Sequence, residues 1–426
     1  MAKEKVDLLI LNANELLTLK GGSDKPLTGK SMRNLAIIKN GSLAAHEGKI
    51  VAVGKTKEIK RRFEGEEVID AEGKIVLPGF VDPHTHLVFA GSRENEFELR
   101  IEGASYMEIL QRGGGILQTV VETRKTSEEE LLRGCMKTLD AMLLHGTTTV
   151  EAKSGYGLDR DNEIKCLQVL KRLNEKHPVS VVSTFLGAHA VPPEKSADEY
   201  VKFLIEEMIP TVANLKLAEF CDVFCEKGVF NIEQSRRILL SGKEHGLKPK
   251  LHADELSWTG GAELAAEVEA VSADHLLFAS EKGMEALARS NVVAVLLPLA
   301  SFTLMMGCYA DARRMIEIGV PVALGTDFNP SCWAESQQLT IAFACCQLKL
   351  TPAEAITATT VNAAHAINRA HEVGSLEVGK KADATVFDVP NHKFLGYRFG
   401  VNLAETVVKN GRIVVDCGKL VNYRHH

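Results

Sequence analysis

The segment Leu77-Pro78-Gly79-Phe80-Val81-Asp82-Pro83-His84-Thr85-His86 decides how the rest of the chain is interpreted. Its apolar residues predict a buried strand, and Pro83, which has no N–H to donate to a sheet, marks the end of regular pairing. Side chains two residues apart in an extended chain point the same way, so His84 and His86 project together from the strand end. Two adjacent imidazoles can form half of a metal site, or they can be unrelated polar residues of a loop. Ligands farther along the chain must decide between these alternatives.

The composition is that of an ordinary globular protein. The chain has 426 residues, of which 45% are hydrophobic and 25% are charged, and this length suits one large α/β barrel with a smaller second domain. The formal net charge of −6 argues against nucleic acid or an anionic membrane as the main partner. No signal peptide or membrane-spanning run is visible. The nine scattered cysteines form no C-x-x-C pair, which favours reduced thiols in a cytoplasmic protein.

Both ends of the chain have the short, alternating strands of an antiparallel β domain. The predicted strands are residues 6–12, 35–38, 49–54, 383–388 and 405–415. The last of these contains an Asn-Gly pair, which is typical of a hairpin turn. Because each half looks too small to bury a core, we expect one composite β-sandwich domain built from residues 1–74 and 374–426.

Residues 75–373 alternate apolar strands with amphipathic helices, such as 128–144 and 161–176, which is the pattern of parallel βα units. The first predicted strand ends in His84 and His86, and the other seven are 147–153, 179–186, 221–226, 248–253, 270–275, 292–297 and 321–326. Eight such units favour a closed (β/α)8 TIM-like barrel. The alternative is an open doubly wound sheet, which normally has a glycine-rich phosphate turn after its first strand. This chain has histidines there instead.

The last helix of this region is predicted to begin at Thr351-Pro352-Ala353-Glu354. A capping threonine, a proline in the first helical position and a glutamate in the third are typical of a helix start. The alanine-rich body of this helix, residues 358–366, suits close packing against the barrel.

Catalytic groups of such barrels sit at the carboxyl ends of the strands. In this sequence His252 lies at the end of the fifth predicted strand and Asp327 at the end of the eighth. His84, His86, His252 and Asp327 can therefore converge on one point. Three imidazoles and a carboxylate suit one Zn²⁺ or Fe²⁺ ion with a position left for water.

This arrangement resembles the amidohydrolase superfamily, whose members pair a metal-bearing barrel with a composite β domain. Residues 78–86 are similar to the signature of the first barrel strand in this superfamily. Residues 374–383 are similar to the segment where the chain returns from the barrel to the β domain. The resemblance therefore covers essentially the whole chain. Within the superfamily, four motifs resemble the imidazolonepropionase family: Arg-Gly-Gly-Gly-Ile at 112–116, Lys-Ser-Gly-Tyr-Gly-Leu at 153–158, Leu-Gly-Ala-His-Ala-Val-Pro-Pro at 186–193 and His-Ala-Asp-Glu at 252–255.

The resemblance implies a hydrolase that acts on a cyclic amide C–N bond. It implies conversion of 4-imidazolone-5-propanoate to N-formimidoyl-L-glutamate in histidine degradation, with one zinc or iron ion per subunit and a homodimer as the assembly. Many superfamily relatives hold two metals bridged by a carboxylated lysine, and Lys153 ends the second predicted strand. Since the finer resemblance implies one metal, we interpret Lys153 as a structural residue.

The implied substrate is a small flat ring with a carboxylate tail. Arg93, in the loop after the first strand, can offer this tail a two-pronged donor. The alternative for Arg93 is a surface ion pair with Glu94 or Glu96. Tyr156 and His189 are expected to hydrogen-bond the substrate. Tyr106 either closes the pocket from the first loop or is an exposed residue of that loop.

Three more positions are expected to contact the substrate beside Asp327. Asn329 points the same way as Asp327 if the eighth strand persists. Members of the imidazolonepropionase family usually carry Gly and then Ser or Thr after Asn329-Pro330, whereas this chain has Ser331-Cys332. That departure puts the backbone contacts of Ser331 and Cys332, and the fit around the carboxylate, in doubt.

The proton transfers are assigned to three residues. Asp327, with His275 beside it, is expected to accept a proton from a metal-activated water and to return one to the departing ring nitrogen. Glu255 lies three residues after His252, where it can face the ring nitrogens and share in the transfer.

Two rival functions remain open. A related guanine or cytosine deaminase would use a similar metal set, but its substrate has no propanoate, so Arg93 would matter little. A non-catalytic scaffold relative would have lost its ligands, whereas all four ligand positions are filled here.

Overall fold

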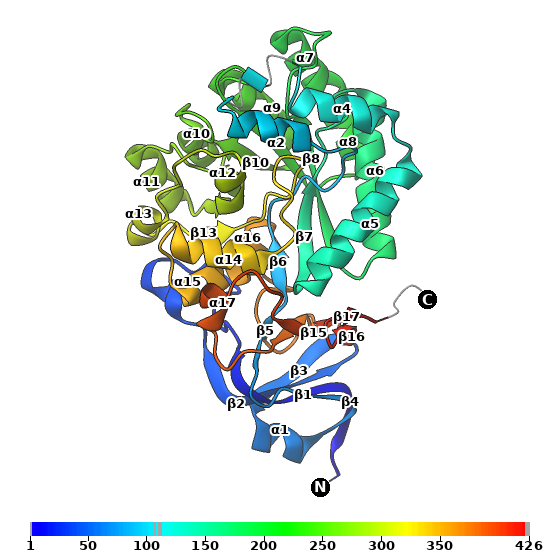
Figure 1. Cartoon of the computed structure of the whole chain (residues 1–426), viewed down its shortest axis with the longest axis vertical. Coiled ribbons are helices and arrows are strands. Elements are labelled where there is room, and N and C mark those ends of the chain that lie inside the picture. The colour runs from blue at the N-terminus through cyan, green and yellow to red at the C-terminus, as the bar shows by residue number, and fades with distance from the viewer. Residues whose placement is uncertain (1, 105–107, 110–112, 422–426) are drawn as a thin grey trace.

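The computed structural model describes residues 2–104, 108–109 and 113–421. Two sheets organise the chain: a barrel of eight parallel strands and a mixed nine-stranded sheet that lies below it in Figure 1. No helix within those ranges is long and apolar enough to cross a membrane. The expectation of a barrel joined to a smaller β domain is confirmed.

The barrel strands follow one another in chain order around the sheet. They are β6 (Phe80–Asp82), β7 (Thr147–Lys153), β8 (Ser180–Ala188), β9 (Phe220–Cys225), β10 (Lys248–Ala253), β11 (Ser272–His275), β12 (Val293–Leu296) and β13 (Val322–Leu324). The gap between β13 and β6 is bridged just beyond the strands, where Asp327 N donates to His84 O (3.1 Å) and His86 N donates to Phe328 O (2.8 Å). The barrel is therefore nearly closed, and the alternative of an open doubly wound sheet is wrong.

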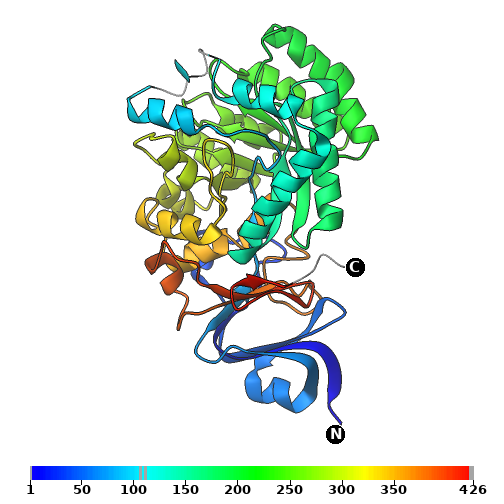
Figure 2. The ribbon, with the colours of Figure 1, turned by 45° about the vertical axis from the view of Figure 1, so that its right-hand side comes forward.

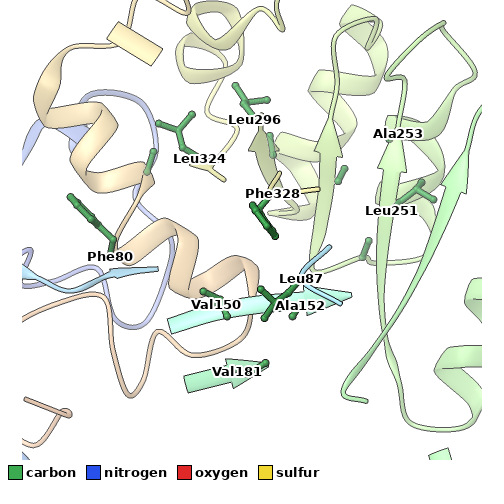
Figure 3. Packing of buried hydrophobic residues seen from close by; sticks show 14 of the residues in the cluster. Phe80, Leu87, Val150, Ala152, Val181, Leu251, Ala253, Leu296, Leu324 and Phe328 are labelled. Atoms are coloured by element: carbon green, nitrogen blue, oxygen red, sulfur yellow. The ribbon is translucent and has the colours of Figure 1, made fainter. Parts of the chain in front are cut away.

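The barrel strands are buried because helices cover their outer face while side chains fill the interior. All seven residues of β7 are buried. Figure 3 shows members of one continuous apolar cluster on different strands, among them Phe80 on β6, Val150 on β7, Leu251 on β10 and Leu324 on β13. Each fully buried side chain of this size stabilises the fold by about 1.5–3 kcal/mol.

The helices around the barrel begin at the signals that the sequence carries. Ser127 and Glu130 form a capping box at the start of α5, which spans Glu128–Leu144 as predicted, and Asp159 caps α6 (Arg160–Lys176). The others are α2 (Glu94–Ile101), α4 (Ile116–Lys125), α7 (Ala197–Phe203), α8 (Ile209–Asn214), α9 (Ile232–Glu244), α10 (Gly261–Glu267), α11 (Glu281–Ser290), α12 (Pro298–Thr303), α13 (Ala312–Glu317) and α14 (Gln337–Cys346).

The second sheet joins the two ends of the chain. Its strands are β1 (Glu4–Leu17), β2 (Ile37–His46), β3 (Lys49–Lys55), β4 (Phe63–Asp70), β5 (Ile75–Pro78), β14 (Ala384–Phe387), β15 (Ala404–Lys409), β16 (Arg412–Asp416) and β17 (Lys419–Leu420). The N- and C-terminal parts meet where β5 pairs with β14. Figure 2 shows the C-terminal strands between the barrel and the N-terminal strands.

This sheet is not purely antiparallel, as the alternating pattern had suggested. The long strand β1 pairs in parallel with β4 along its first half and with β5 near its end. A break in register between Ile10 and Ala13, where Asn12 has a φ of 62°, separates the two halves of β1. Since β5 pairs in this sheet and β6 in the barrel, the chain passes between the two near Gly79. The boundaries at residues 74 and 374 stay a prediction.

The helix predicted after Thr351 is divided into α15 (Pro352–Ala358) and α16 (Val361–Ala366). The capping box of Thr351 and Glu354 is present. The helix is interrupted where the hydroxyl groups of Thr359 and Thr360 donate back to the carbonyl groups of Ala355 (3.0 Å) and Ile356 (2.6 Å). Such side-chain bonds compete with the helical backbone pattern, which the alanine-rich sequence did not reveal.

Glu354 also ties this helix to its neighbours. Its carboxylate accepts hydrogen bonds from Arg313 on α13 (2.7 Å) and from Arg33 (3.1 Å), which ends the short helix η1 (Gly29–Arg33). It also accepts one from the backbone of Thr351 (2.8 Å). One capping residue therefore fastens the N-terminal segment to the barrel.

Glu354→Gln is expected to remove an acid-sensitive part of the stability. Burial opposes the ionisation of Glu354, but hydrogen bonds from Arg313, Thr351 and Arg33 outweigh it and lower its pKa from 4.5 to about 2. A carboxyl group whose pKa falls on folding stabilises the fold above its unfolded pKa, and this contribution is lost as the pH falls through its folded pKa. The difference in free energy of unfolding between wild type and variant should be constant above about pH 5.5 and shrink towards about pH 2.

Urea unfolding followed by circular dichroism across this pH range measures that difference. If the wild type and Glu354→Gln differ equally at pH 3 and pH 7, the ionised carboxylate does not make this contribution.

Candidate active site

Four predicted metal ligands meet at the carboxyl end of the barrel. The Nε2 atoms of His84 and His86 are 3.3 Å apart, and the Nε2 atoms of His86 and His252 are also 3.3 Å apart. Oδ1 of Asp327 lies 3.5 Å from Nε2 of both His84 and His86. In a tetrahedral zinc site with bonds of about 2.0–2.1 Å, neighbouring ligand atoms are ~3.3–3.5 Å apart. These four distances fit a single ion of that size.

The protonation of the histidines also fits a metal ion. Nδ1 of His84 lies 2.6 Å from Asp274, and Nδ1 of His252 lies 3.1 Å from Asp222. With Nδ1–H donated to these carboxylates, Nε2 of each neutral ring carries a lone pair that points at the other ligand atoms. Burial, reinforced by the charge of Lys153, holds the pKa of His84 well below 6.5, so this ring is in the neutral form that binds metals.

Asp327 supplies a negative charge that the surrounding residues do not satisfy. Its Oδ1 accepts no hydrogen bond from the described residues and is buried. Burial raises the pKa of Asp327 to about 7. A cation among Asp327 and the three facing lone pairs would compensate this buried charge. The donor set therefore fits a resident metal ion.

The barrel closure places Asp327 beside the two histidines of the first strand. Thr326 donates its backbone N–H (3.1 Å) and its hydroxyl (2.6 Å) to the buried carboxylate of Asp82. Asp327 has a φ of 50°, which turns its side chain away from the strand direction and towards the histidines. Residues that are 243 positions apart in the sequence, His84 and Asp327, thus become neighbours.

Lys153 lies beneath the cluster inside a network of buried carboxylates. Its Nζ is 2.8 Å from both Glu151 and Asp222 and 3.7 Å from Asp274. Although burial disfavours the charge of Lys153, these three carboxylates raise its pKa above 10.5. A lysine held as a cation by paired acids does not serve as a carboxylated bridge, which agrees with its interpretation as a structural residue.

A pocket opens over the ligand cluster. Of the predicted residues, it is lined by His86, Arg93, Tyr156, His189, His252, Glu255, His275, Asp327, Asn329, Ser331 and Cys332. His84 lies just beneath it in the ligand cluster. Tyr106 lies outside the described residues.

Arg93 is a buried residue of this pocket and not the surface ion pair that the sequence left open. It is 5% exposed. Its Nε–H donates to Thr119 (2.9 Å) and Nη1 donates to Ser331 (3.0 Å), whereas Glu96 accepts from the backbone of Gly115 (2.6 Å). Nη2 is buried without a partner among the described residues. A buried cation with a free donor suits an anionic group of a ligand.

Tyr156 and His189 form the wall beside His86. The His189 ring stacks on the His86 ring with centroids 4.8 Å apart, and its centroid is 5.1 Å from that of Tyr156. Nδ1 of His189 contacts the carbonyl oxygen of Gly155 (3.0 Å). Burial lowers the pKa of His189 to about 3, so its neutral ring donates from Nδ1 and presents Nε2 as an acceptor.

The turn that carries Tyr156 is held from below by one acid. The carboxylate of Glu163 on α6 accepts backbone hydrogen bonds from Gly155 (3.1 Å), Gly157 (2.7 Å) and Leu158 (3.0 Å). Gly155 has a φ of 110°, which requires glycine. The first Gly of the motif at 153–158 therefore shapes the turn that aims Tyr156 into the pocket.

Glu255 and His275 lie next to each other in the lining of the pocket. Oε2 of Glu255 is 3.6 Å from Nε2 of His275, and neither nitrogen of His275 has a hydrogen-bond partner in the described part of the chain. His275 also lies within ligand-like range of His84 and His252. Burial, followed by the charge of Asp327, raises the pKa of Glu255 well above 4.5. Either residue can exchange a proton with a group bound beside the pair.

The expectation that Asn329 points like Asp327 depends on a persisting eighth strand, and that condition is not met. Strand β13 ends at Leu324. The side-chain amide of Asn329 donates to the carbonyl of Asp327 (2.8 Å) and accepts from the backbone of Ser331 (2.7 Å) and Cys332 (3.1 Å). Asn329 therefore shapes the loop, as asparagine commonly does in turns, although it still lines the pocket.

Sequence reasoning missed the acids that orient the ligands. The carboxylates of Asp222 and Asp274 are hydrogen-bonded to Nδ1 of His252 and of His84. The carboxylate of Asp82 accepts the hydroxyl of Thr326, the residue before Asp327. The available signal was the presence of aspartates inside apolar strands, such as Phe220-Cys221-Asp222-Val223. A buried carboxylate needs a partner, so each of these residues could have been suspected.

Known proteins resemble this chain along nearly its whole length. The sequence profile of the amidohydrolase family matches residues 75–414. The imidazolonepropionase of Geobacillus kaustophilus (strain HTA426) is 56% identical over 420 residues, which cover 97% of this chain and 99% of the relative. The imidazolonepropionase of Alkaliphilus oremlandii (strain OhILAs) is 52% identical over 422 residues, which cover 98% and 100%.

Solved structures share the fold at low sequence identity. A zinc-bound adenosine deaminase from Xanthomonas campestris has a TM-score of 0.76 at 19% identity and covers 99% of this chain and 95% of its own. An atrazine chlorohydrolase from Arthrobacter aurescens TC1, complexed with zinc, has a TM-score of 0.72 at 15% identity and covers 97% and 96%.

Proposed function

The chain belongs to the amidohydrolase family, and on that premise we propose that it is an imidazolonepropionase. It hydrolyses the cyclic amide of 4-imidazolone-5-propanoate to N-formimidoyl-L-glutamate, a reaction of histidine degradation. Near-full-length relatives with this name support the proposal at 52–56% identity. The observation that carries it is the position of Arg93, a buried cation with a free Nη2 in the same pocket as the ligand cluster.

His84, His86, His252 and Asp327 are proposed to hold one metal ion per subunit, zinc or iron. When bound, this ion would polarise the ring carbonyl and lower the pKa of water at the site. Asp274 and Asp222 hold His84 and His252 in the required tautomer, and such outer contacts commonly raise metal affinity 10–100-fold.

The pocket residues orient the flat ring between two walls. Tyr156 and His189 are proposed to hydrogen-bond the substrate on one side, where Nε2 of His189 accepts a ring N–H. Arg93 binds the propanoate at the far end of the pocket, next to Ser331. Because both ends of the substrate are held, its scissile amide would be aligned over the ligand cluster. Such alignment supplies much of the rate enhancement in reactions of this kind.

Asp327 and His275 are proposed to carry the proton. Asp327 accepts it from water, and it then passes to the departing ring nitrogen. Glu255 lies beside His275, 3.6 Å away, and is proposed to hydrogen-bond the ring nitrogens. Burial raises the pKa of Glu255 well above 4.5, which favours its protonated form and suits a role as donor to the leaving nitrogen.

Turnover assays with purified, metal-loaded protein test this function. We expect loss of the ring absorbance of 4-imidazolone-5-propanoate and formation of N-formimidoyl-L-glutamate, but no deamination of guanine or cytosine. Deamination of either base, with no hydrolysis of the imidazolone, would replace this proposal with the deaminase alternative.

Arg93→Ala is expected to raise KM for 4-imidazolone-5-propanoate by about 100-fold and to change kcat less. A charge-assisted hydrogen bond contributes roughly 1.5–3 kcal/mol, and each 1.36 kcal/mol corresponds to a factor of ten. Steady-state kinetics measure both constants. A deaminase of substrates without a carboxylate would tolerate this substitution, so an unchanged KM would contradict the role of Arg93.

The protein is further proposed to be a cytoplasmic homodimer. All nine cysteines lie within the described ranges and are free thiols, which suits a reducing compartment. The dimer follows from the resemblance alone, and sedimentation analysis of the purified protein tests it.

A further inference from the structure

The helices α2 and α4 lie over the pocket and are tied together by two reciprocal contacts. Arg93, directly before α2, donates from Nε to Oγ1 of Thr119 on α4 (2.9 Å). In the opposite direction, Glu96 of α2 accepts the backbone N–H of Gly115 at the start of α4 (2.6 Å). The position of the Arg93 side chain thus depends on a residue that follows it by 26 positions.

The contact with Thr119 limits which donors of Arg93 remain available. A guanidinium group has five N–H donors. The Nε–H is taken by Thr119 and one Nη1–H by Ser331, while Nη2 has no partner among the described residues. The free donors are therefore gathered at the end of the guanidinium group, on Nη1 and Nη2, which is a geometry that can bind both oxygens of a carboxylate.

Thr119 is well placed to act through Arg93 alone. It is 3% exposed and does not line the pocket. A threonine within a helix commonly turns its hydroxyl back to a carbonyl of the preceding turn, but here its oxygen accepts the N–H of Arg93. Without this acceptor the Nε–H would be buried and unpaired, which disfavours the present orientation of the guanidinium group.

We propose that Thr119 is a positioning residue that fixes the guanidinium group of Arg93 and so sets the selectivity of this pocket for ligands with a carboxylate tail. The identity of the substrate rests on the proposed function. The hydrogen bond from Arg93 to Thr119, called the clamp below, rests only on the contacts of Arg93.

Thr119→Val tests the clamp because it removes the hydroxyl and keeps the size and branching of the side chain. Thr119→Ala serves as a second variant without the hydroxyl, and Thr119→Ser restores it. Thr123→Val is the matched control: Thr123 lies one turn later on α4, is fully buried, and accepts a hydrogen bond from the backbone of Ala90 (3.1 Å). It has no contact with Arg93 that the described structure records.

Calorimetric titration of the metal-loaded protein with 3-(imidazol-4-yl)propanoate and with its uncharged amide gives the selectivity directly. We expect Thr119→Val and Thr119→Ala to weaken binding of the carboxylate about tenfold, as for loss of one hydrogen bond to a charged group. Binding of the amide should change less than about twofold. Thr119→Ser and Thr123→Val should keep the wild-type ratio of the two affinities.

Kinetics give a second readout. In Thr119→Val, KM for 4-imidazolone-5-propanoate should rise about tenfold while kcat stays within about threefold. A general loosening of α4 would instead appear equally in Thr123→Val. The inference is overturned if Thr119→Val keeps the wild-type preference for the carboxylate, if Thr123→Val loses it to the same extent, or if the wild type shows no preference.

Failure of the inference is distinguishable from failure of the proposed function. If the wild type hydrolyses the imidazolone but Thr119→Val keeps its selectivity, only the clamp is rejected. If the wild type does not hydrolyse the imidazolone but shows a carboxylate preference that depends on Thr119, the clamp stands and the proposed reaction is rejected.

Discussion

His252→Ala should lower the metal content of the purified protein from about one ion per chain to nearly none and reduce kcat by on the order of 10³-fold or more. His252 is the ligand supplied by β10, and its Nε2 lies 3.3 Å from that of His86. Its loss leaves three of the four proposed ligands and releases Asp222 from its contact with Nδ1 (3.1 Å). A metal ion contributes several kcal/mol of charge stabilisation, and each 1.36 kcal/mol is a factor of ten in rate.

His46→Ala is the control for the loss of a histidine. His46 ends β2 in the other sheet and pairs with Asp7 (2.8 Å) at the surface. This variant should keep both metal and turnover. Elemental analysis measures the metal content of the two variants, and steady-state kinetics measure their kcat. A His252→Ala protein that retains its metal and most of its kcat would exclude His252 as a ligand.

Lys153→Met is expected to destabilise the protein by about 3–5 kcal/mol, the usual effect of breaking a buried ion pair from one side. Lys153 is fully buried, and its ammonium group is the cation between Glu151, Asp222 and Asp274. Without it, buried carboxylates are left uncompensated. Because Asp222 and Asp274 also orient metal ligands, metal affinity should fall by about 10–100-fold.

Lys250→Met provides a matched comparison. Lys250 is also fully buried inside the barrel, but no ion pair of its Nζ is recorded in the part of the chain that the structure describes. This Nζ donates to the hydroxyl of Ser272 (2.8 Å) and the carbonyl of Ala366 (3.0 Å) and lies over the ring of Phe220. Its replacement should cost about 1–3 kcal/mol. Urea unfolding of metal-free protein at neutral pH measures both variants, and a Lys153→Met protein no less stable than Lys250→Met would contradict the ion-pair network.

The barrel and the convergence of its ligands could be predicted from the sequence because both follow from local patterns. Strands β7 and β10 lie at the predicted residues, 147–153 and 248–253. Parallel strands of a barrel present their carboxyl ends on one face. Histidines and an aspartate at those ends must then lie near one another, whatever the details of the loops.

Features that depend on long-range packing could not be predicted. Asn329 was placed by extending a strand that in fact ends at Leu324, and only the positive φ of Asp327 reveals the turn between them. The environment of Arg93 depends on Thr119, a residue on another helix. Periodicity reports which face of an element is apolar but not which side chain of a distant element meets it.

Anomalous diffraction from crystals of the metal-loaded protein, recorded on both sides of the zinc and iron absorption edges, locates the ion relative to its four proposed ligands. We expect one anomalous peak per chain, within about 2.0–2.2 Å of Nε2 of His84, His86 and His252 and of Oδ1 of Asp327. This expectation is contradicted if the peak is absent from a protein that turns over the imidazolone, or if Asp327 or His252 lies beyond bonding distance of the ion bound by His84 and His86.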